Sequence, residues 1–210
     1  MAGDFLKADL HLHSSYSFDG RVPPKEIVEQ AKRKGLDIVG ITDHGTIAGA
    51  REAKKYAKGI TVLIGQETKT LQGDILVFNV NRNLEQKKDI LETCKAVKKA
   101  GGFIVIPHPF DPLRSGTEKV LNRILPFIDA IEGFNSRCFF GSSNRKAEHY
   151  AAVHGIPAIA SSDAHRLVDI GRSYTLFEGS DLFRAIRNGR IKMVRQGVGK
   201  VKLLGRKIGI

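Results

Sequence analysis

The chain contains no tryptophan, only two cysteines and no long apolar run. The cysteines, Cys94 and Cys138, are too few to hold together a small disulfide-rich fold, which excludes that class of secreted protein. No segment approaches the roughly 20 apolar residues that a membrane-spanning helix needs. The N-terminal residues also lack the apolar stretch of a signal peptide. These absences lead us to expect a protein of the reducing cytoplasm.

The composition nevertheless supplies enough apolar surface for a folded core. Hydrophobic residues make up 41% of the 210 residues and charged residues 27%, which is typical of globular proteins. Intrinsic disorder is therefore not expected for the chain as a whole. The length fits one ordinary domain, or one domain with a short appendage.

Positive charge is in excess and is unevenly distributed. The chain has 34 Lys and Arg against 22 Asp and Glu, a net charge of +12, and residues 190–210 contribute +7 with no acidic residue. We therefore expect a main domain over residues 1–189 and a basic, partly apolar extension over residues 190–210. The extension is either solvated, or a final strand with exposed lysines, or an arm that binds nucleic acid or acidic lipid.

Apolar segments typical of strands alternate along the chain with amphipathic, charged segments. Strands are predicted over residues 9–13, 37–42, 60–65, 75–80, 103–106, 130–133, 157–161 and 174–178. Helices are predicted over residues 23–34, 46–57, 84–100, 118–125, 142–154 and 181–188. This alternation is typical of an α/β protein with a parallel sheet covered by helices. The number of units favours a TIM-like barrel over an open sheet.

Histidines gather where the predicted strands end. Five of the seven, together with two carboxylates, directly follow strands: His11, His13, His44, His108 and His165, with Glu67 and Asp163. Because the carboxyl ends of barrel strands meet at one mouth, these residues are expected to lie together. The remaining two, His149 and His154, fall on a predicted helix and are expected to be surface or packing residues.

Imidazoles combined with a few carboxylates suit Zn, Mn or Fe and suit Ca poorly. The candidates are too many for one tetrahedral ion, so two or three divalent ions that share a bridging carboxylate fit better. The alternative is that each histidine is a satisfied structural residue. That alternative suits a single histidine better than five at converging strand ends.

The order of these motifs resembles that of a known family. The motifs are Asp9-Leu10-His11-Leu12-His13-Ser14, Asp19-Gly20, Ile41-Thr42-Asp43-His44, Gly65-Gln66-Glu67, His108-Pro109 and Ser162-Asp163-Ala164-His165. In this combination the chain resembles the PHP (polymerase and histidinol phosphatase) superfamily, and residues 170–174 resemble its stand-alone members. The resemblance implies a distorted (β/α)7 barrel with a phosphoesterase site of two or three metal ions at its mouth.

The resemblance also implies a set of metal ligands. The first ion would be held by His11, His13, Glu67 and Asp163. Glu67 would bridge to a second ion bound by His108. The third ion would be held by Asp19, His44 and His165. Two further candidates for the second ion are Glu132, near the end of the sixth predicted strand, and Asn135, just after it.

The expected chemistry is hydrolysis of a phosphate ester by a metal-activated water. A cationic side chain should clamp the non-bridging phosphate oxygens, and Arg137 is the main candidate because it follows the sixth predicted strand. Arg114, Arg145 and Arg166 are weaker candidates. His165 would protonate the leaving group if it did not bind metal.

Asp43 precedes a candidate ligand and has two interpretations. It either orients the neighbouring His44 as a hydrogen-bond partner, or it caps the following helix. The connection over residues 110–119 is similarly open, since it either shapes the pocket or is a plain surface loop.

Three functions remain open on the sequence alone. The first is a phosphatase for a small phosphorylated metabolite or nucleotide. The second is a nuclease or 3′-end phosphodiesterase on DNA or RNA, with the basic extension holding the backbone. The third is a non-catalytic protein subunit of an RNA-processing particle. The physiological substrate and the oligomeric state do not follow from the residues.

Overall fold

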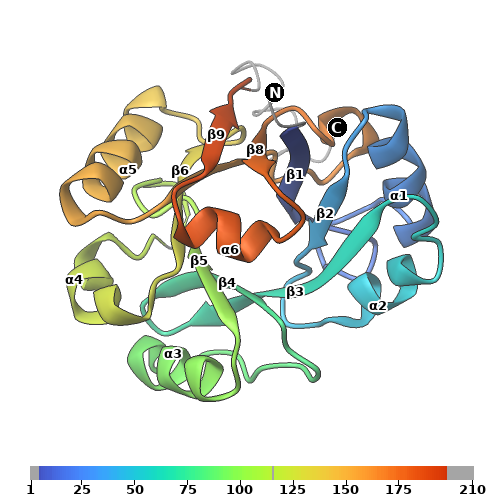
Figure 1. The fold of residues 1–210 in the computed structure, drawn as a ribbon. Helices are drawn as coiled ribbons and strands as arrows, with labels where there is room; N and C mark the ends of the chain where they lie inside the picture. The colour runs from blue at the N-terminus through green and yellow to red at the C-terminus, as the bar shows by residue number, and fades with distance from the viewer. Residues whose placement is uncertain (1–4, 115, 198–210) are drawn as a thin grey trace.

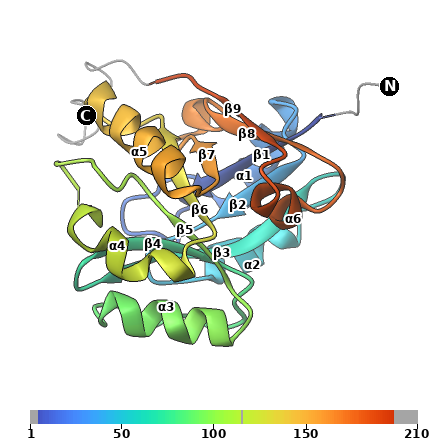
Figure 2. The same ribbon diagram turned by 60° about the vertical axis from the view of Figure 1, so that its left-hand side comes forward.

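A computed structural model describes residues 5–114 and 116–197 as a curved, nearly closed sheet surrounded by helices (Figures 1 and 2). The strands are β1 Phe5–Leu12, β2 Ile38–Ile41, β3 Thr61–Thr70, β4 Gly73–Phe78, β5 Phe103–Ile106, β6 Ala130–Asn135, β7 Ala158–Ser161, β8 Tyr174–Glu178 and β9 Ile191–Val194. The α-helices are α1 Pro24–Arg33, α2 Ala48–Lys54, α3 Ile90–Lys99, α4 Leu121–Ile124, α5 Gly141–His154 and α6 Leu182–Arg187. Short 3-10 helices span Glu118–Val120, Leu125–Phe127 and Leu167–Asp169.

The strand order is β7-β6-β5-β4-β3-β2-β1-β8-β9. The sheet closes where Leu12, at the end of β1, bridges Ala164, just after the end strand β7, and the backbone N–H of His13 donates to the Ala164 carbonyl at 2.9 Å. The predicted TIM-like barrel is therefore confirmed. Within the described residues it has nine strands, rather than the seven or eight expected.

The expectation of an all-parallel sheet is wrong in two places. β4 runs antiparallel to both β3 and β5, and β8 runs antiparallel to β1. Only Leu71 and Gln72 connect β3 to β4, and so short a connection can form a hairpin but not a parallel crossover. This hairpin is one reason why the barrel is distorted.

One further difference from the sequence analysis concerns an element boundary. The helix predicted over residues 84–100 begins only at Ile90, because the Asp89 carboxylate caps it by accepting from the backbone N–H of Leu91 and Glu92.

The first part of the predicted basic extension forms β9, which pairs antiparallel with β8 and leaves Lys192 exposed, in agreement with the interpretation as a final strand. Residues 198–210 of the extension lie outside the described residues.

Helices α1 to α5 lie outside the sheet, whereas α6 lies across one open end of the barrel (Figure 1). Leu182, Ala185 and Ile186 of α6 pack into the barrel interior with Phe103 at the start of β5. The Phe183 ring stacks on Phe103 at 4.3 Å between ring centres. Helix α6 thus seals the end at which β5 begins with apolar side chains, so polar groups can gather only at the opposite mouth.

None of the helices within the described residues is both long and apolar enough to cross a membrane.

Phe78 of β4 fills part of the barrel interior, where its ring packs against one glycine on β2 and one on β3. A Cβ atom on Gly65 would lie 2.7 Å from Cε1 of this ring, and one on Gly40 would lie 2.8 Å from the same atom. These approaches are closer than carbon atoms tolerate, and all three residues are buried. Because Gly40 of β2 and Gly65 of β3 have no side chain, there is room for the ring of Phe78.

We predict that Gly65→Ala lowers the free energy of unfolding by about 1–3 kcal/mol through overpacking. Gly197→Ala is the matched control, because a Cβ there meets no atom within 4 Å. Chemical denaturation should show the loss for Gly65→Ala alone, with part of it recovered in Gly65→Ala/Phe78→Leu. Equal losses for the two alanine variants would contradict this account of the barrel interior.

Candidate metal centre

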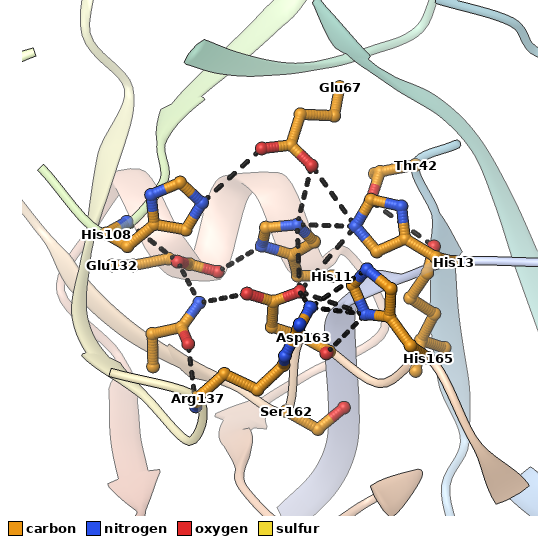
Figure 3. A network of polar contacts seen from close by, with 12 residues as sticks. His11, His13, Thr42, Glu67, His108, Glu132, Arg137, Ser162, Asp163 and His165 are labelled. Atoms are coloured by element: carbon orange, nitrogen blue, oxygen red, sulfur yellow. Dashed lines mark hydrogen bonds and ion pairs between the residues drawn. The ribbon is translucent and has the colours of Figure 1, made fainter. Parts of the chain in front are cut away.

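The predicted site residues meet at the mouth opposite α6, as Figure 3 shows for most of them. They come from the end of β1, the segment after β2, the middle of β3, the segments after β5 and β7, and the end of β6. Most of these side chains are almost completely buried, and Asp19 and His44 are the more accessible ones, with 31% and 23% of their side chains exposed. The convergence expected from the barrel is thus observed.

Glu67 lies at the centre of this cluster. Its Oε2 atom lies 3.1 Å from Nε2 of both His11 and His13. The same oxygen is 3.6 Å from His44 Nδ1, and Oε1 is 3.4 Å from His108 Nε2. One carboxylate therefore faces four imidazoles, as a bridging ligand between metal ions would.

The donor atoms fall into three overlapping groups, each with its atoms within 4.8 Å of one another: His11, His13 and Asp163; His11, Glu67 and His108; and His13, Asp19 and His44. Nitrogen and carboxylate oxygen donors in this ratio fit divalent transition metals. His11 Nε2 and His13 Nε2 also face each other at 3.0 Å, an arrangement that a shared cation satisfies. The residues present therefore fit the two or three ions that the family resemblance implies.

The backbone is strained at two candidate ligands. Asp163 has φ +53° and His108 has φ +30°, values that residues other than glycine rarely adopt. Such strain persists only where the surrounding structure imposes it, and it is concentrated at functional sites. Both residues directly follow the buried strands β7 and β5, where the chain turns to present a side chain to the mouth.

The charge state of the central carboxylates follows from their surroundings. Burial alone would raise the pKa of the Asp163 carboxyl, but the charges of His11 and Arg114 hold that pKa well below its usual range. Burial acts in the same direction on Glu67, where His11 and the hydrogen bond with His108 outweigh it and lower the pKa. Both carboxylates are therefore ionised at neutral pH and available as ligands.

Glu132 has its oxygens fully engaged by other protein groups. Its Oε1 lies 2.8 Å from His11 Nδ1, and its Oε2 accepts from the His108 backbone N–H at 2.9 Å and from Asn135 Nδ2 at 2.8 Å. The Asn135 amide also donates to Asp163 and accepts from the Arg137 backbone N–H. These contacts suit Glu132 and Asn135 to orienting the candidate ligands rather than to binding metal themselves.

Two arginines from different segments contact Asp163, Arg114 from the segment after β5 and Arg137 from the segment after β6. Arg137 Nη1 lies 3.3 Å from Asp163 Oδ1 and 2.7 Å from His165 Nδ1. Arg114 Nη1 donates to Asp163 Oδ2, and its Nε donates to the buried Asp111 at 3.0 Å. Arg114, a weaker candidate on the sequence, therefore lies as close to the centre as Arg137.

The other two arginine candidates lie elsewhere. Arg145 is exposed on α5, and Arg166 is exposed and paired with Asp169 at 3.7 Å. Neither lines the cavity of about 280 Å³ at the centre. His149 and His154 are exposed on α5, as expected.

Asp43 holds the loop that carries Asp19. It accepts from the Ser14 backbone N–H at 2.6 Å and from Ser14 Oγ at 2.7 Å. Helix α2 begins at Ala48 with Ile47 in the capping position, so the interpretation of Asp43 as a helix cap is wrong. Burial raises the pKa of Asp43 to about 6. Both carboxylate oxygens of Asp43 thus hold the segment after β1.

Sequence reasoning missed several residues of the mouth. Lys69 and Asp74 line the central cavity from the β3–β4 hairpin, which places both strands beside Glu67. Asp9 was quoted only as part of a motif, yet its carboxylate accepts from the backbone N–H of Ser162 and Gly171, each at 3.0 Å. Asp9 thereby ties β1 to the segment that carries Asp163.

A barrel whose mouth gathers imidazoles and carboxylates in overlapping groups defines the class of metal-dependent hydrolases. The family model of the PHP domain matches residues 9–109, and that described as PHP-associated matches residues 141–191. The two segments contain every residue of the three donor groups, whereas Glu132 and Asn135 lie between the segments. The chain belongs to the PHP domain family and is a metal-dependent phosphoric ester hydrolase.

Individual proteins are similar to the chain in sequence or in fold. An uncharacterised protein of Methanocaldococcus jannaschii is 35% identical over 144 residues, which cover 62% of this chain and 82% of the relative. A two-domain protein of Bacteroides vulgatus containing a predicted PHP-like metal-dependent phosphoesterase has a similar structure, with a TM-score of 0.77 at 22% identity over 99% of this chain and 70% of its own. A lesion-specific endonuclease of Pyrococcus furiosus gives a TM-score of 0.65 at 19% identity over 94% of this chain and 60% of its own.

We predict that Glu132→Gln lowers the affinity for divalent metal by about 10–100-fold, because an amide cannot accept from all the donors that Glu132 serves. Competition with a chromogenic chelator measures this affinity. Glu85→Gln is the control, since Glu85 is exposed and paired only with Lys88 in the described structure. Unchanged metal affinity in Glu132→Gln would show that Glu132 does not orient His11 and His108.

Proposed function

We propose that this chain hydrolyses the phosphate ester of a small metabolite or nucleotide at the mouth of the barrel. The observation that carries the proposal is the position of Glu67, shared among candidate ligands, within one cavity that also contains Arg114 and Arg137. Carboxylates and imidazoles suit metal ions, while guanidinium groups suit phosphate oxygens. The combination is what a metal-assisted phosphoesterase requires.

The proposed ligands are those of the three donor groups, with Glu67 shared between ions. Zn, Mn or Fe ions bound there would neutralise phosphate oxygens and lower the pKa of bound water. Glu132 and Asn135 would orient the ligands, and Asp43 would fix the segment that bears Asp19. A cytoplasmic setting remains our expectation.

His165 is proposed to hold the proton that the leaving group takes up. It does not belong to any of the three donor groups found among the described residues. Its Nε2 lies 2.9 Å from Asp19 Oδ2, and its Nδ1 lies 3.0 Å from the Asp163 carbonyl oxygen. Arg114 and Arg137 would bind the non-bridging phosphate oxygens, since each guanidinium faces the same small cavity.

We predict that the purified protein hydrolyses a generic aryl phosphate when Mn or Zn is supplied, and that His11→Ala and Asp163→Ala each lower this rate by at least about 100-fold. Loss of a residue that only orients a ligand already costs about 10–100-fold, so loss of a ligand should cost no less. His149→Ala is the matched control because His149 is exposed on α5. Equal rates in all four proteins would refute the assignment of the centre.

A second function, cleavage of DNA or RNA, is favoured by the structural similarity to the Pyrococcus endonuclease. In this case the basic residues after 197, namely Lys200, Lys202, Arg206 and Lys207, would contact the phosphate backbone. The alternative of a non-catalytic subunit is not supported, because the chain belongs to a family of hydrolases.

For the nuclease alternative we predict that affinity for single-stranded DNA falls steeply with salt, and that a 1–197 truncation makes the slope shallower by up to about 3 units. This truncation retains β9, so the sheet edge stays intact. Aryl phosphate hydrolysis should not change and serves as the control. The same salt slope in both proteins would exclude a contribution of residues 198–210 to nucleic-acid binding.

A further inference from the structure

A second, larger cavity adjoins the metal centre. It has a volume of about 650 Å³, compared with about 280 Å³ at the centre itself. Lys69 and Arg114 line both cavities, so the two spaces are neighbours separated by these side chains. A cavity of this size accommodates a ligand considerably larger than a single phosphate group.

Three lysines from distant parts of the chain line the larger cavity. Lys69 lies on β3, Lys119 on the 3-10 helix before α4, and Lys146 on α5. None of the three ammonium groups has an ion-pair partner within the described part of the chain. Their charges are therefore available to an anionic ligand.

The acidic groups of the same cavity do not cancel this charge. Asp111 is buried and its carboxylate is already paired with Arg114 at 3.0 Å. Glu118 is the other carboxylate in the lining. Against these two stand three lysines and Arg114, so the cavity favours an anion, and phosphate is the anion that lysine and arginine together recognise best.

Apolar side chains form another part of the lining. Phe110 and Phe140 both face the cavity, and Phe140 is 42% exposed although it is large and apolar. An aromatic ring left this accessible beside cationic groups suits a ligand with a planar or apolar part. The connection over residues 110–119 was open on the sequence, and its residues Phe110–Pro112, Arg114, Gly116, Glu118 and Lys119 contribute to the wall of a cavity.

We propose that this cavity binds a second phosphate group of the substrate, separate from the one that is hydrolysed. The proposal rests on the phosphoesterase function proposed for the metal centre. The second phosphate is either the other terminal phosphate of a bisphosphorylated nucleotide or an internal phosphodiester of an oligonucleotide, and both present the same oxyanion to Lys119 and Lys146.

Competitive inhibition of aryl phosphate hydrolysis by the full chain supplied with Mn tests the proposal, because the carboxylates of the centre are then neutralised. The competing probes are thymidine 5′-monophosphate, thymidine 3′,5′-bisphosphate and the 5′-phosphorylated dinucleotide pTpT, and the inhibition constant of each reports its binding. The wild-type chain should bind at least one of the two-phosphate probes at least about tenfold more tightly than the monophosphate. The Lys119→Ala/Lys146→Ala variant should lose this preference.

Lys95→Ala/Lys99→Ala is the matched control, because it removes the same charge from exposed positions on α3 and should retain the preference. A preference for the bisphosphate alone identifies a terminal phosphate, and a preference for pTpT alone identifies an internal diester. No preference in the wild-type chain, or the same preference in Lys119→Ala/Lys146→Ala, would overturn the proposal. No hydrolysis of the aryl phosphate by the wild-type chain supplied with Mn or Zn would instead refute the phosphoesterase function.

Discussion

The buried carboxylate of Glu67 is the group on which the architecture of the mouth depends. A negative charge in this position is costly unless it is paired, and here four imidazoles face its two oxygens. Those imidazoles come from three different strand ends of the barrel. The contacts around Glu67 therefore require β1, β2 and β5 to end at the level of Glu67 within β3, which only a closed or nearly closed sheet provides.

A second ring of hydrogen bonds maintains this arrangement. Glu132, Asp9 and Asp43 do not face the centre of the cluster, but each accepts hydrogen bonds that fix a ligand or the segment that carries one. All three accept from a backbone N–H group of another segment of the barrel. Because α6 fills the other end with apolar side chains, water-facing polar groups are confined to one mouth, and strain at Asp163 and His108 is supported there.

The sequence was sufficient for those features that depend on local pattern. The strands, their order along the chain and the gathering of histidines at their ends follow from periodicity and from the geometry of barrels. The β3–β4 hairpin was missed as an antiparallel pair because the third strand was predicted to end at residue 65, whereas β3 continues to Thr70 and leaves only two connecting residues. The position of Arg114 could not be predicted, since it depends on Asp111, which folds the segment after β5 back toward Asp163.

The two cavities at the mouth differ in the charge of the side chains that line them. Asp19, Glu67, Asp74 and Asp163 line the central cavity, and such a set of carboxylates repels a phosphate unless cations neutralise it. Divalent ions at the imidazoles, together with Arg114 and Arg137, can reverse the local potential. The adjoining cavity has no such cluster of carboxylates and needs no metal, because lysines supply its charge. An anionic substrate is therefore attracted by a few basic side chains around the mouth. The basic residues near the C-terminus are only one source of the net charge of +12.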